Sequence, residues 1–206
     1  MKREVIIAVL VLVFSNPAWS TIVTPTIDNP DFEYPGTETI SWQDAPGWSS
    51  DIEALKSGIK SDPTSPGNYV GSLYNGDPSV YNLSENIIQL EDDYILELDA
   101  INSSPDNTPA LLEISLFLDV YGDRVTIAST IVKTTESWMT FSLGYYANSF
   151  PAVYNKIGVE LANVTENGNS WISVDNVRFV PEPATMALLG FGSLVLLRNR
   201  KNNGQK

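Results

Sequence analysis

Carboxylates dominate the side chains of this sequence that can do chemistry. The 206 residues include 25 Asp and Glu but no His and no Cys. Thiolate nucleophiles, Ser-His-Asp triads and nearly all zinc, copper and haem sites are therefore excluded. Acid–base catalysis would fall to carboxylates, Tyr or Lys, and no spacing of these residues indicates a catalytic group, so we predict no catalytic residues. Oxygen ligands in this number suit a hard divalent cation such as Ca²⁺.

The charge is concentrated between residues 21 and 180. This part holds 23 of the Asp and Glu residues but only six Lys and Arg, so its net charge is near −17. Such a surface repels nucleic acid and anionic lipid, and we predict neither as a partner. A soluble exported protein or a cation-binding protein fits the same charge.

Two tyrosines are candidates for ligand binding. Tyr74 and Tyr81 flank the turn-rich sequence NGDPS, and aromatic residues in loops contact ligands more often than those in strands do. A sugar ring can stack on the plane of an exposed aromatic side chain. The alternative, which is the commoner role of such residues, is that both fill the core or its rim.

Alternating apolar and polar residues predict an all-β fold for residues 21–180. The alternation is clearest in YILELDA (94–100), LLEISLFLDV (111–120), SWMTFSLGYY (137–146) and NKIGVEL (155–161). One buried and one wetted face per strand is typical of antiparallel sheets packed as a sandwich. About eight such strands favour a jelly-roll. Residues 51–60 are the best helix candidate, with one or two turns, and Ile40 and Trp42 indicate an early strand.

The strand WISVDNVRFV (171–180) breaks its own alternation. Ile172 and Val174 share one face, whereas Val177 and Phe179 fall on the opposite face if the strand is regular. We favour a bulge near Asp175 and Asn176 that resets the pattern, because it would direct Asp175 at a particular contact. The alternative is that both faces are partly covered and Asp175 is exposed.

The N-terminus, MKREVIIAVLVLVFSNPAWS, is typical of a secretory signal peptide. Lys2 and Arg3 precede an apolar run, and Ala18 and Ser20 frame a cleavage site. We predict that residues 1–20 direct the chain to the secretion machinery and are removed; the alternative is an N-terminal membrane anchor.

The C-terminus, residues 181–206, has three ordered parts. Pro181, Glu182 and Pro183 precede an apolar run (184–197), which Arg198, Arg200 and Lys201 follow. As a helix, the run would reach about 21 Å, less than the bilayer core of about 30 Å. This arrangement resembles the PEP-CTERM sorting signal of Gram-negative bacteria; the alternative is a plain membrane anchor.

The PEP-CTERM resemblance implies a route for the protein. A membrane-embedded exosortase would recognise the short hydrophobic helix while it anchors the chain transiently in the inner membrane, and would cut near Pro-Glu-Pro. The domain would then reach the cell surface or the extracellular matrix.

IDNPDFE (27–33), the following Gly-Trp and the closing VDNVRF (174–179) resemble the galactose-binding-like jelly-rolls of carbohydrate-binding modules. This resemblance implies a structural calcium site, with carboxylates from Glu33 and Asp175 and carbonyls from the loop around Asn29. The alternative is that Asn-Pro and Asp-Asn only form turns.

The sequence also resembles the calcium-dependent Stig cyclases, through the Gly-Trp, PGNYVGSLYNGD (66–77) and VDNVRF. The sorting signal and the carbohydrate-binding-module resemblance together predict a structural or glycan-associated protein, in contact with extracellular polysaccharide in a biofilm. A carbohydrate-binding module with a defined sugar ligand is the alternative, and a cyclase-like enzyme is a third candidate.

Overall fold

The computed structural model describes residues 24–39, 41–89, 93–106, 108–147, 155–166 and 168–180. The predicted signal peptide with Ala18 and Ser20, and the predicted sorting signal from Pro181 to Lys201, lie outside these residues. Within them, no helix is long and apolar enough to cross a membrane.

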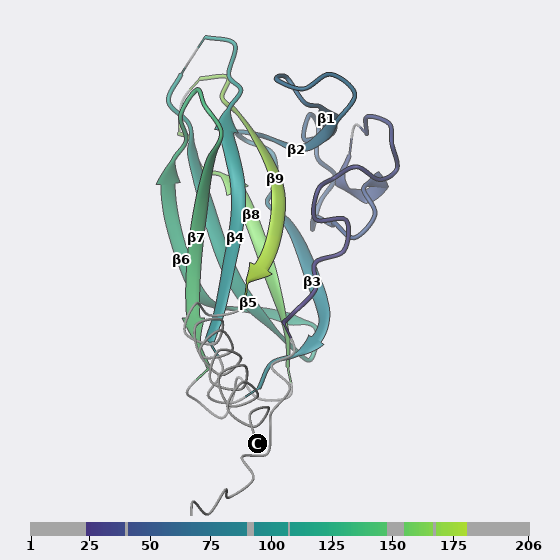
Figure 1. Cartoon of the computed structure of the whole chain (residues 1–206), viewed down its shortest axis with the longest axis vertical. Helices are drawn as coiled ribbons and strands as arrows, with labels where there is room; N and C mark the ends of the chain where they lie inside the picture. The colour runs from purple at the N-terminus through teal and green to yellow at the C-terminus, as the bar shows by residue number, and fades with distance from the viewer. Residues whose placement is uncertain are drawn as a thin grey trace, which may run out of the picture.

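The described residues form two antiparallel sheets that pack face to face (Figure 1). One sheet has the order β1-β2-β9-β4-β7, with β1 Gly58–Ser61, β2 Tyr69–Tyr74, β9 Trp171–Val180, β4 Asp93–Asn102 and β7 Met139–Tyr146. The other has the order β3-β8-β5-β6, with β3 Val80–Ile87, β8 Lys156–Asn163, β5 Leu111–Val120 and β6 Asp123–Lys133. The predicted all-β sandwich is confirmed.

The core lies between the sheets and follows the alternation of the sequence. On β5, Leu112, Ile114 and Leu116 are buried in the central core, whereas Glu113 projects to the opposite face. Alternate residues of β4 are buried in the same way. Since successive side chains of a strand point to opposite faces, each of these strands presents one apolar face to the core.

A bulge interrupts the pairing of β4 with β9. Asp99 pairs with Asp175, but Glu97 pairs with Arg178, so β9 holds one extra residue over this interval. Asn176 has a φ of 52°, which lies in the left-handed region. Because the extra residue resets the alternation, Val177 and Phe179 join Val174 in the core, and the predicted bulge is confirmed.

Two predictions between residues 40 and 60 are wrong. Residues 51–57 form no helix, and the chain then enters β1 directly. Trp42 belongs to a 3₁₀ helix, η1 (Trp42–Asp44), rather than to a strand. Ile40 lies outside the described residues.

The cause is tertiary packing. The Trp42 ring is buried with its centroid 6.2 Å from that of Phe32 and 6.4 Å from that of Trp48. This aromatic cluster fills the space between the N-terminal segment and the sandwich, and its burial outweighs the weak local preference for a strand.

The segment from residue 24 to residue 57 lies beside β1, β2 and β3 (Figure 1). Its backbone is tied to the sandwich at several points: Val177 donates to the Pro30 carbonyl at 2.9 Å, and Ser49 and Tyr81 exchange hydrogen bonds at 2.9 and 2.8 Å. The opening loop therefore contacts the bulged strand, while the following residues extend the β3 edge.

Candidate functional site

The outer face of the β3-β8-β5-β6 sheet carries a row of polar and aromatic side chains. The pairing register places Tyr81 of β3 beside Glu160 of β8, and Glu160 beside Ser115 of β5. In the next row, Gly158 pairs with Phe117. These residues occupy the strand positions that alternate with the core residues, so they face away from the other sheet.

Phe117 is an apolar residue on this polar face. It is 1% exposed but does not belong to the central core. Its ring lies across Gly158, where a Cβ atom would overlap the ring, and meets the Tyr81 ring edge to face with a centroid distance of 6.1 Å. Glycine at position 158 thus allows an aromatic pair to form on the outside of the sheet.

Arg124 of β6 reaches over these rings. Its guanidinium carbon lies 4.0 Å from the centroid of the Tyr81 ring and 5.8 Å from that of Phe117. Such contacts between a guanidinium and an aromatic face are attractive. Since β6 and β3 are the two outer strands of this sheet, the Arg124 and Tyr81 side chains together bridge its width.

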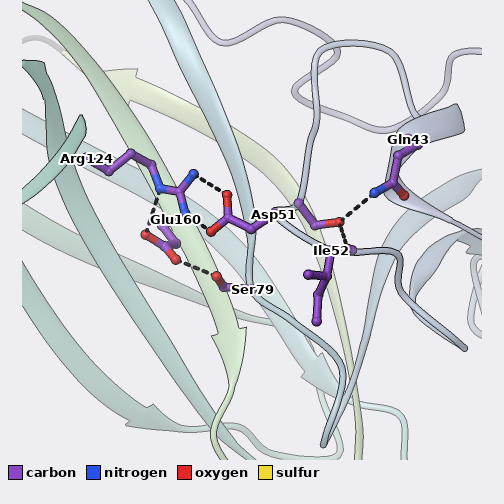
Figure 2. Close-up of polar contacts among 7 residues, drawn as sticks. Gln43, Asp51, Ile52, Ser79, Arg124 and Glu160 are labelled. Atoms are coloured by element: carbon purple, nitrogen blue, oxygen red, sulfur yellow. Dashed lines mark hydrogen bonds and ion pairs between the residues drawn. The ribbon is translucent and has the colours of Figure 1, made fainter. Parts of the chain in front are cut away.

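Two carboxylates hold the guanidinium in place (Figure 2). Arg124 Nη1 donates to Asp51 Oδ1 at 2.8 Å and Nη2 donates to Asp51 Oδ2, while Nε lies 3.7 Å from Glu160 Oε2. The hydrogen bonds with Arg124 are the main cause that lowers the pKa of Asp51, and those with Asp51 are the main cause that raises the pKa of Arg124. Asp51 and Arg124 are therefore both charged near neutral pH.

The loop that carries Asp51 is itself fixed. Ser50 donates its hydroxyl to the Ile52 carbonyl at 2.7 Å and accepts from Gln43 Nε2 at 3.4 Å (Figure 2). On the sheet, Ser79 donates its hydroxyl to Glu160 Oε1. Asp51 therefore closes over the sheet as part of an ordered network.

Two cavities border this network. The outer groove, of about 290 Å³, is lined by Ser79, Glu113, Ser115, Thr126, Glu160 and Ala162. The edge cavity, of about 480 Å³, is lined by Thr26, Ile27, Asp28, Gly47, Ser49, Tyr81, Leu83 and Glu85. Tyr81 and Glu160 pair across neighbouring strands and belong to different cavities, so these two residues mark the boundary between them.

The structure separates the two predicted ligand-binding tyrosines. Tyr81 is on the outer face of one sheet, whereas Tyr74 is on β2 of the other sheet, paired with Trp171. The Tyr74 ring packs against Trp171 with centroids 4.8 Å apart and the ring planes tilted by 51°, and the Tyr74 hydroxyl donates to Asn169 at 2.8 Å. A single ligand site does not include both.

The three residues predicted to bind calcium lie in the region where the opening loop meets β9. Burial raises the pKa of Asp175 to about 6, the charges of Asp31, Asp99 and Glu33 act in the same direction, and the Asn176 N–H opposes them. Four carboxylates thus lie close enough to interact. Asn176 donates its side-chain amide to Asp99 at 3.0 Å and to Asp175 at 3.4 Å, which offsets part of their repulsion.

Other contacts already use part of this donor set. Asn29 accepts from the Tyr34 N–H at 3.1 Å and donates to the Tyr34 and Pro46 carbonyls, and its own carbonyl accepts from the Trp48 indole at 3.0 Å. Glu33 accepts from the Tyr69 N–H at 3.0 Å. Among the described residues, no three carboxylates are arranged to hold a metal ion. The oxygen chemistry fits Ca²⁺, and calcium binding by Glu33 and Asp175 stays a prediction.

Calcium is expected to stabilise the protein. At a concentration 100-fold above the Kd, a bound ion adds about 2.7 kcal/mol, which raises the Tm of a domain of this size by about 5–10 °C. Asp175→Asn is expected to remove this response and to stabilise the chelator-treated protein, because it removes one of four like charges. Thermal melts with and without Ca²⁺ measure both effects. Asp123→Asn, at an exposed position on β6, is the matched control and keeps the response; an equal response in Asp175→Asn would contradict the prediction.

A comparison with known protein families identifies the C-terminal sorting signal. Residues 179–201 match the PEP-CTERM protein-sorting motif. This motif implies an exported protein that exosortase processes through a C-terminal membrane-anchoring signal. The motif overlaps the last two residues of β9 and continues beyond the end of this strand. No curated protein matches the chain.

The fold is similar to those of proteins with different functions. A cyclase from Fischerella sp. TAU in complex with 4-(1H-indol-3-yl)butan-2-one is 21% identical, with a TM-score of 0.62 over 78% of this chain and 98% of the cyclase. A CBM4 carbohydrate-binding module is 14% identical, with a TM-score of 0.52 over 76% of this chain and all of the module. An arabinose-bound GH51 α-L-arabinofuranosidase is 18% identical, with a TM-score of 0.54 over 77% of this chain and 26% of the enzyme. At these identities the likeness establishes the carbohydrate-binding-module-like fold alone.

Sequence reasoning missed the network of Asp51, Arg124 and Glu160. These residues lie on a loop and two different strands, and only the folded sheets bring them together. One signal was present: within LLEISLFLDV, Phe117 falls on the same face as Glu113 and Ser115. A large aromatic residue on a face that is otherwise polar indicates a contact outside the core.

Proposed function

We propose that this exported protein binds extracellular polysaccharide at the cell surface or in the extracellular matrix, and that the ligand contacts Tyr81 at the edge of the outer groove. The half-buried Tyr81 ring, fixed by Arg124 at 4.0 Å at the boundary of two cavities, is the observation that carries this proposal. A rigid aromatic ring next to hydroxyl and carboxylate groups offers both a stacking surface and hydrogen bonds to a sugar.

The charges of the outer groove favour a neutral sugar. Glu113 and Glu160 line it, and the guanidinium beside it is already paired with Asp51. An anionic sugar would meet uncompensated negative charge, whereas the hydroxyls of a neutral sugar can donate to both carboxylates. The CBM4 likeness supports the scaffold for such a role, and the PEP-CTERM motif supports an extracellular location.

A cyclase-like activity is the second candidate, supported by the likeness to the Fischerella cyclase. A proton-transferring carboxylate would have to reach its substrate from a cavity. Glu160 lines the outer groove together with Glu113, but Ser79 and Arg124 both contact Glu160. These contacts already use its carboxylate oxygens and favour a binding role over proton transfer.

Tyr81→Ala is expected to weaken binding of a neutral polysaccharide at least tenfold. The change removes the stacking surface and the contact that orients Arg124, a loss of about 1.4 kcal/mol or more. Affinity gel electrophoresis of the full chain against neutral glucan, xylan and galactan measures it. Tyr81→Phe keeps the ring and is expected to bind as the unchanged protein does, and Tyr74→Ala, on the other sheet, is the second control. Equal weakening by Tyr74→Ala and Tyr81→Ala, or binding that survives Tyr81→Ala, would contradict the proposal.

A further inference from the structure

A separate cleft lies at the β1-β2-β9 end of the other sheet. Its volume is about 340 Å³, and its lining includes Lys60, Ser61, Ser72, Ser103, Trp171 and Ser173, with two prolines at its rim. It shares no lining residue with the outer groove or the edge cavity. Because these residues belong to the opposite sheet, a ligand here would contact a different face of the sandwich.

Trp171 is the aromatic wall of this cleft, and it is braced from behind. The Tyr74 ring packs against it at 4.8 Å, and the Lys56 ammonium lies 3.8 Å from the centroid of the Tyr74 ring. The Tyr74 hydroxyl is held by Asn169. A side chain fixed in this way loses little conformational entropy when it stacks on a ligand.

The rim of the cleft is also fixed. Trp138 donates its indole N–H to the Thr64 hydroxyl at 2.9 Å, which anchors the turn that carries Pro63 of the lining. Ser173 donates its hydroxyl to Ser103 at 3.0 Å. The cleft is therefore built from ordered side chains on three strands and two loops.

Ser72 and Ser173 add hydroxyl groups to the lining of the cleft. The two residues pair across β2 and β9, and both line the cleft. A serine hydroxyl can donate to a ligand carboxylate or hydroxyl. Ser72 is therefore a candidate hydrogen-bond donor to a ligand in the cleft.

The charge of the lining differs from that of the other two cavities. Carboxylates line both the outer groove and the edge cavity, whereas Lys60 is the single charged residue of this lining. No carboxylate among the described residues lies within 4 Å of the Lys60 ammonium. In contrast, Arg124, Lys156 and Arg178 each form an ion pair. Glu38 lies nearby: its carboxylate accepts from the Ser61 hydroxyl at 2.7 Å, which lowers the pKa of Glu38, and the Lys60 charge acts in the same direction. Because Glu38 forms no ion pair with Lys60 within 4 Å, the ammonium can still bind an anion in the cleft.

We infer that this cleft is a second carbohydrate-binding site, specific for a carboxylated sugar of the uronic acid class. Trp171 stacks on the sugar ring, Lys60 binds its carboxylate, and Ser72 hydrogen-bonds to it. The domain as a whole is strongly acidic, but at physiological salt its field is screened over about 8 Å, so the nearest charge decides the interaction. Sites on both sheets would let one molecule bridge a neutral and an acidic polysaccharide.

The test compares two probes with the same backbone. Calorimetry of the full chain at physiological salt uses a polygalacturonate oligomer and its fully methyl-esterified form. The acid form is expected to bind at least tenfold more tightly. Lys60→Gln is expected to weaken its binding fivefold or more, and Trp171→Ala to abolish it. Lys133→Gln removes a charge from an exposed position on β6 without an ion pair, and it is the matched control, expected to stay within twofold.

The outcomes distinguish this site from the outer groove. Tyr81→Ala is expected to leave polygalacturonate binding unchanged, so failure of the proposed groove would not remove this site. Equal binding of the two probes, equal effects of Lys60→Gln and Lys133→Gln, or no binding at all would overturn the inference. Because Lys60→Gln changes only a side chain at the cleft surface, its Tm is expected to match that of the unchanged protein, and the result does not depend on whether Trp171→Ala folds.

Discussion

Replacing Phe32 with alanine is expected to lower the free energy of unfolding by about 4 kcal/mol, the upper part of the range for a buried aromatic residue. The Phe32 side chain is 0% exposed and stacks on Trp48 with a centroid distance of 4.8 Å and an interplanar angle of 24°. Gly71 of β2 leaves the space for the ring, since a Cβ atom there would lie 2.7 Å from Phe32 Cζ. Gly71 is fixed by its pairing with β1 and β9, so the backbone on this side cannot collapse to fill the cavity.

The backbone at Phe32 adds to this expectation. Its φ is 55°, in the left-handed region that non-glycine residues rarely adopt. Such a conformation persists where the surrounding packing outweighs its cost. Alanine would keep the backbone cost and lose the packing, so the opening loop is expected to detach from β2 and β9 before the sandwich unfolds.

Chemical denaturation followed by tryptophan fluorescence measures the loss, because Trp42 and Trp48 both contact Phe32. Tyr34→Ala is the matched control: it removes an aromatic ring from the same loop, but the Tyr34 side chain is 65% exposed. Its effect is expected to stay within about 0.5 kcal/mol, as for most surface changes. Similar losses for the two variants would show that the opening loop does not depend on the buried aromatic cluster.

The strands could be predicted because each has one face buried in the core and one face turned away from it. In β4, β5 and β8 the apolar residues alternate so regularly that one register places most of them in the core, with Phe117 on the outer face as an exception. The bulge in β9 could be predicted for the same reason, because Val177 and Phe179 cannot join Ile172 in the core without an extra residue in the strand. In these segments the local sequence pattern agrees with the packing of the whole fold, so their structure can be predicted from the sequence.

The segment from residue 24 to residue 57 was harder because its structure depends on residues far away in the chain. Trp42 is held by Phe32 and Trp48, and residues 55–57 are held by Asp77, 20 or more positions along the chain. Neither contact leaves a periodic pattern in the sequence. A helix over residues 51–60 was a reasonable local expectation that tertiary hydrogen bonds overrode.

The candidate sites also combine features that the local sequence predicts with features that depend on residues far apart in the chain. Tyr81 and Tyr74 were found as aromatic residues beside a turn, but only the sheet order shows that they face opposite sides of the sandwich. Nothing in the sequence indicated the role of Arg124, since its partners come from a loop and from β8, which is separated from β6 by β5. Side-chain chemistry can be read from sequence, whereas the convergence of several side chains requires the fold.

Asp77 organises the segment that carries Asp51, and Asp77→Ala is expected to lower the free energy of unfolding by about 3 kcal/mol. Its carboxylate accepts four hydrogen bonds: from the Leu55 N–H at 3.2 Å, the Lys56 N–H at 2.9 Å, and the Ser57 N–H and hydroxyl at 2.6 and 2.7 Å. Removing it leaves several partly buried donors without an acceptor. The loop over the outer groove loses its anchor, so Asp77→Ala is also expected to weaken polysaccharide binding there.

The pH dependence of this effect follows from the sign of the pKa shift. Burial acts to raise the pKa of Asp77, but the hydrogen bonds from Ser57, Lys56 and Leu55 outweigh it, and the net pKa lies below the ordinary 3.8. A depressed folded-state pKa stabilises the fold above the unfolded value, and this stabilisation is lost as the pH falls through the folded value. Urea denaturation is therefore expected to give a constant difference between the unchanged protein and Asp77→Ala from about pH 8 to 5, and a shrinking one below about pH 4. Asp62→Ala, which removes only two hydrogen bonds to Thr64 in an exposed turn, is the control and is expected to cost less than about 1 kcal/mol. A difference for Asp77→Ala that is equally large at pH 3 and pH 7 would mean that the ionised carboxylate does not hold the loop.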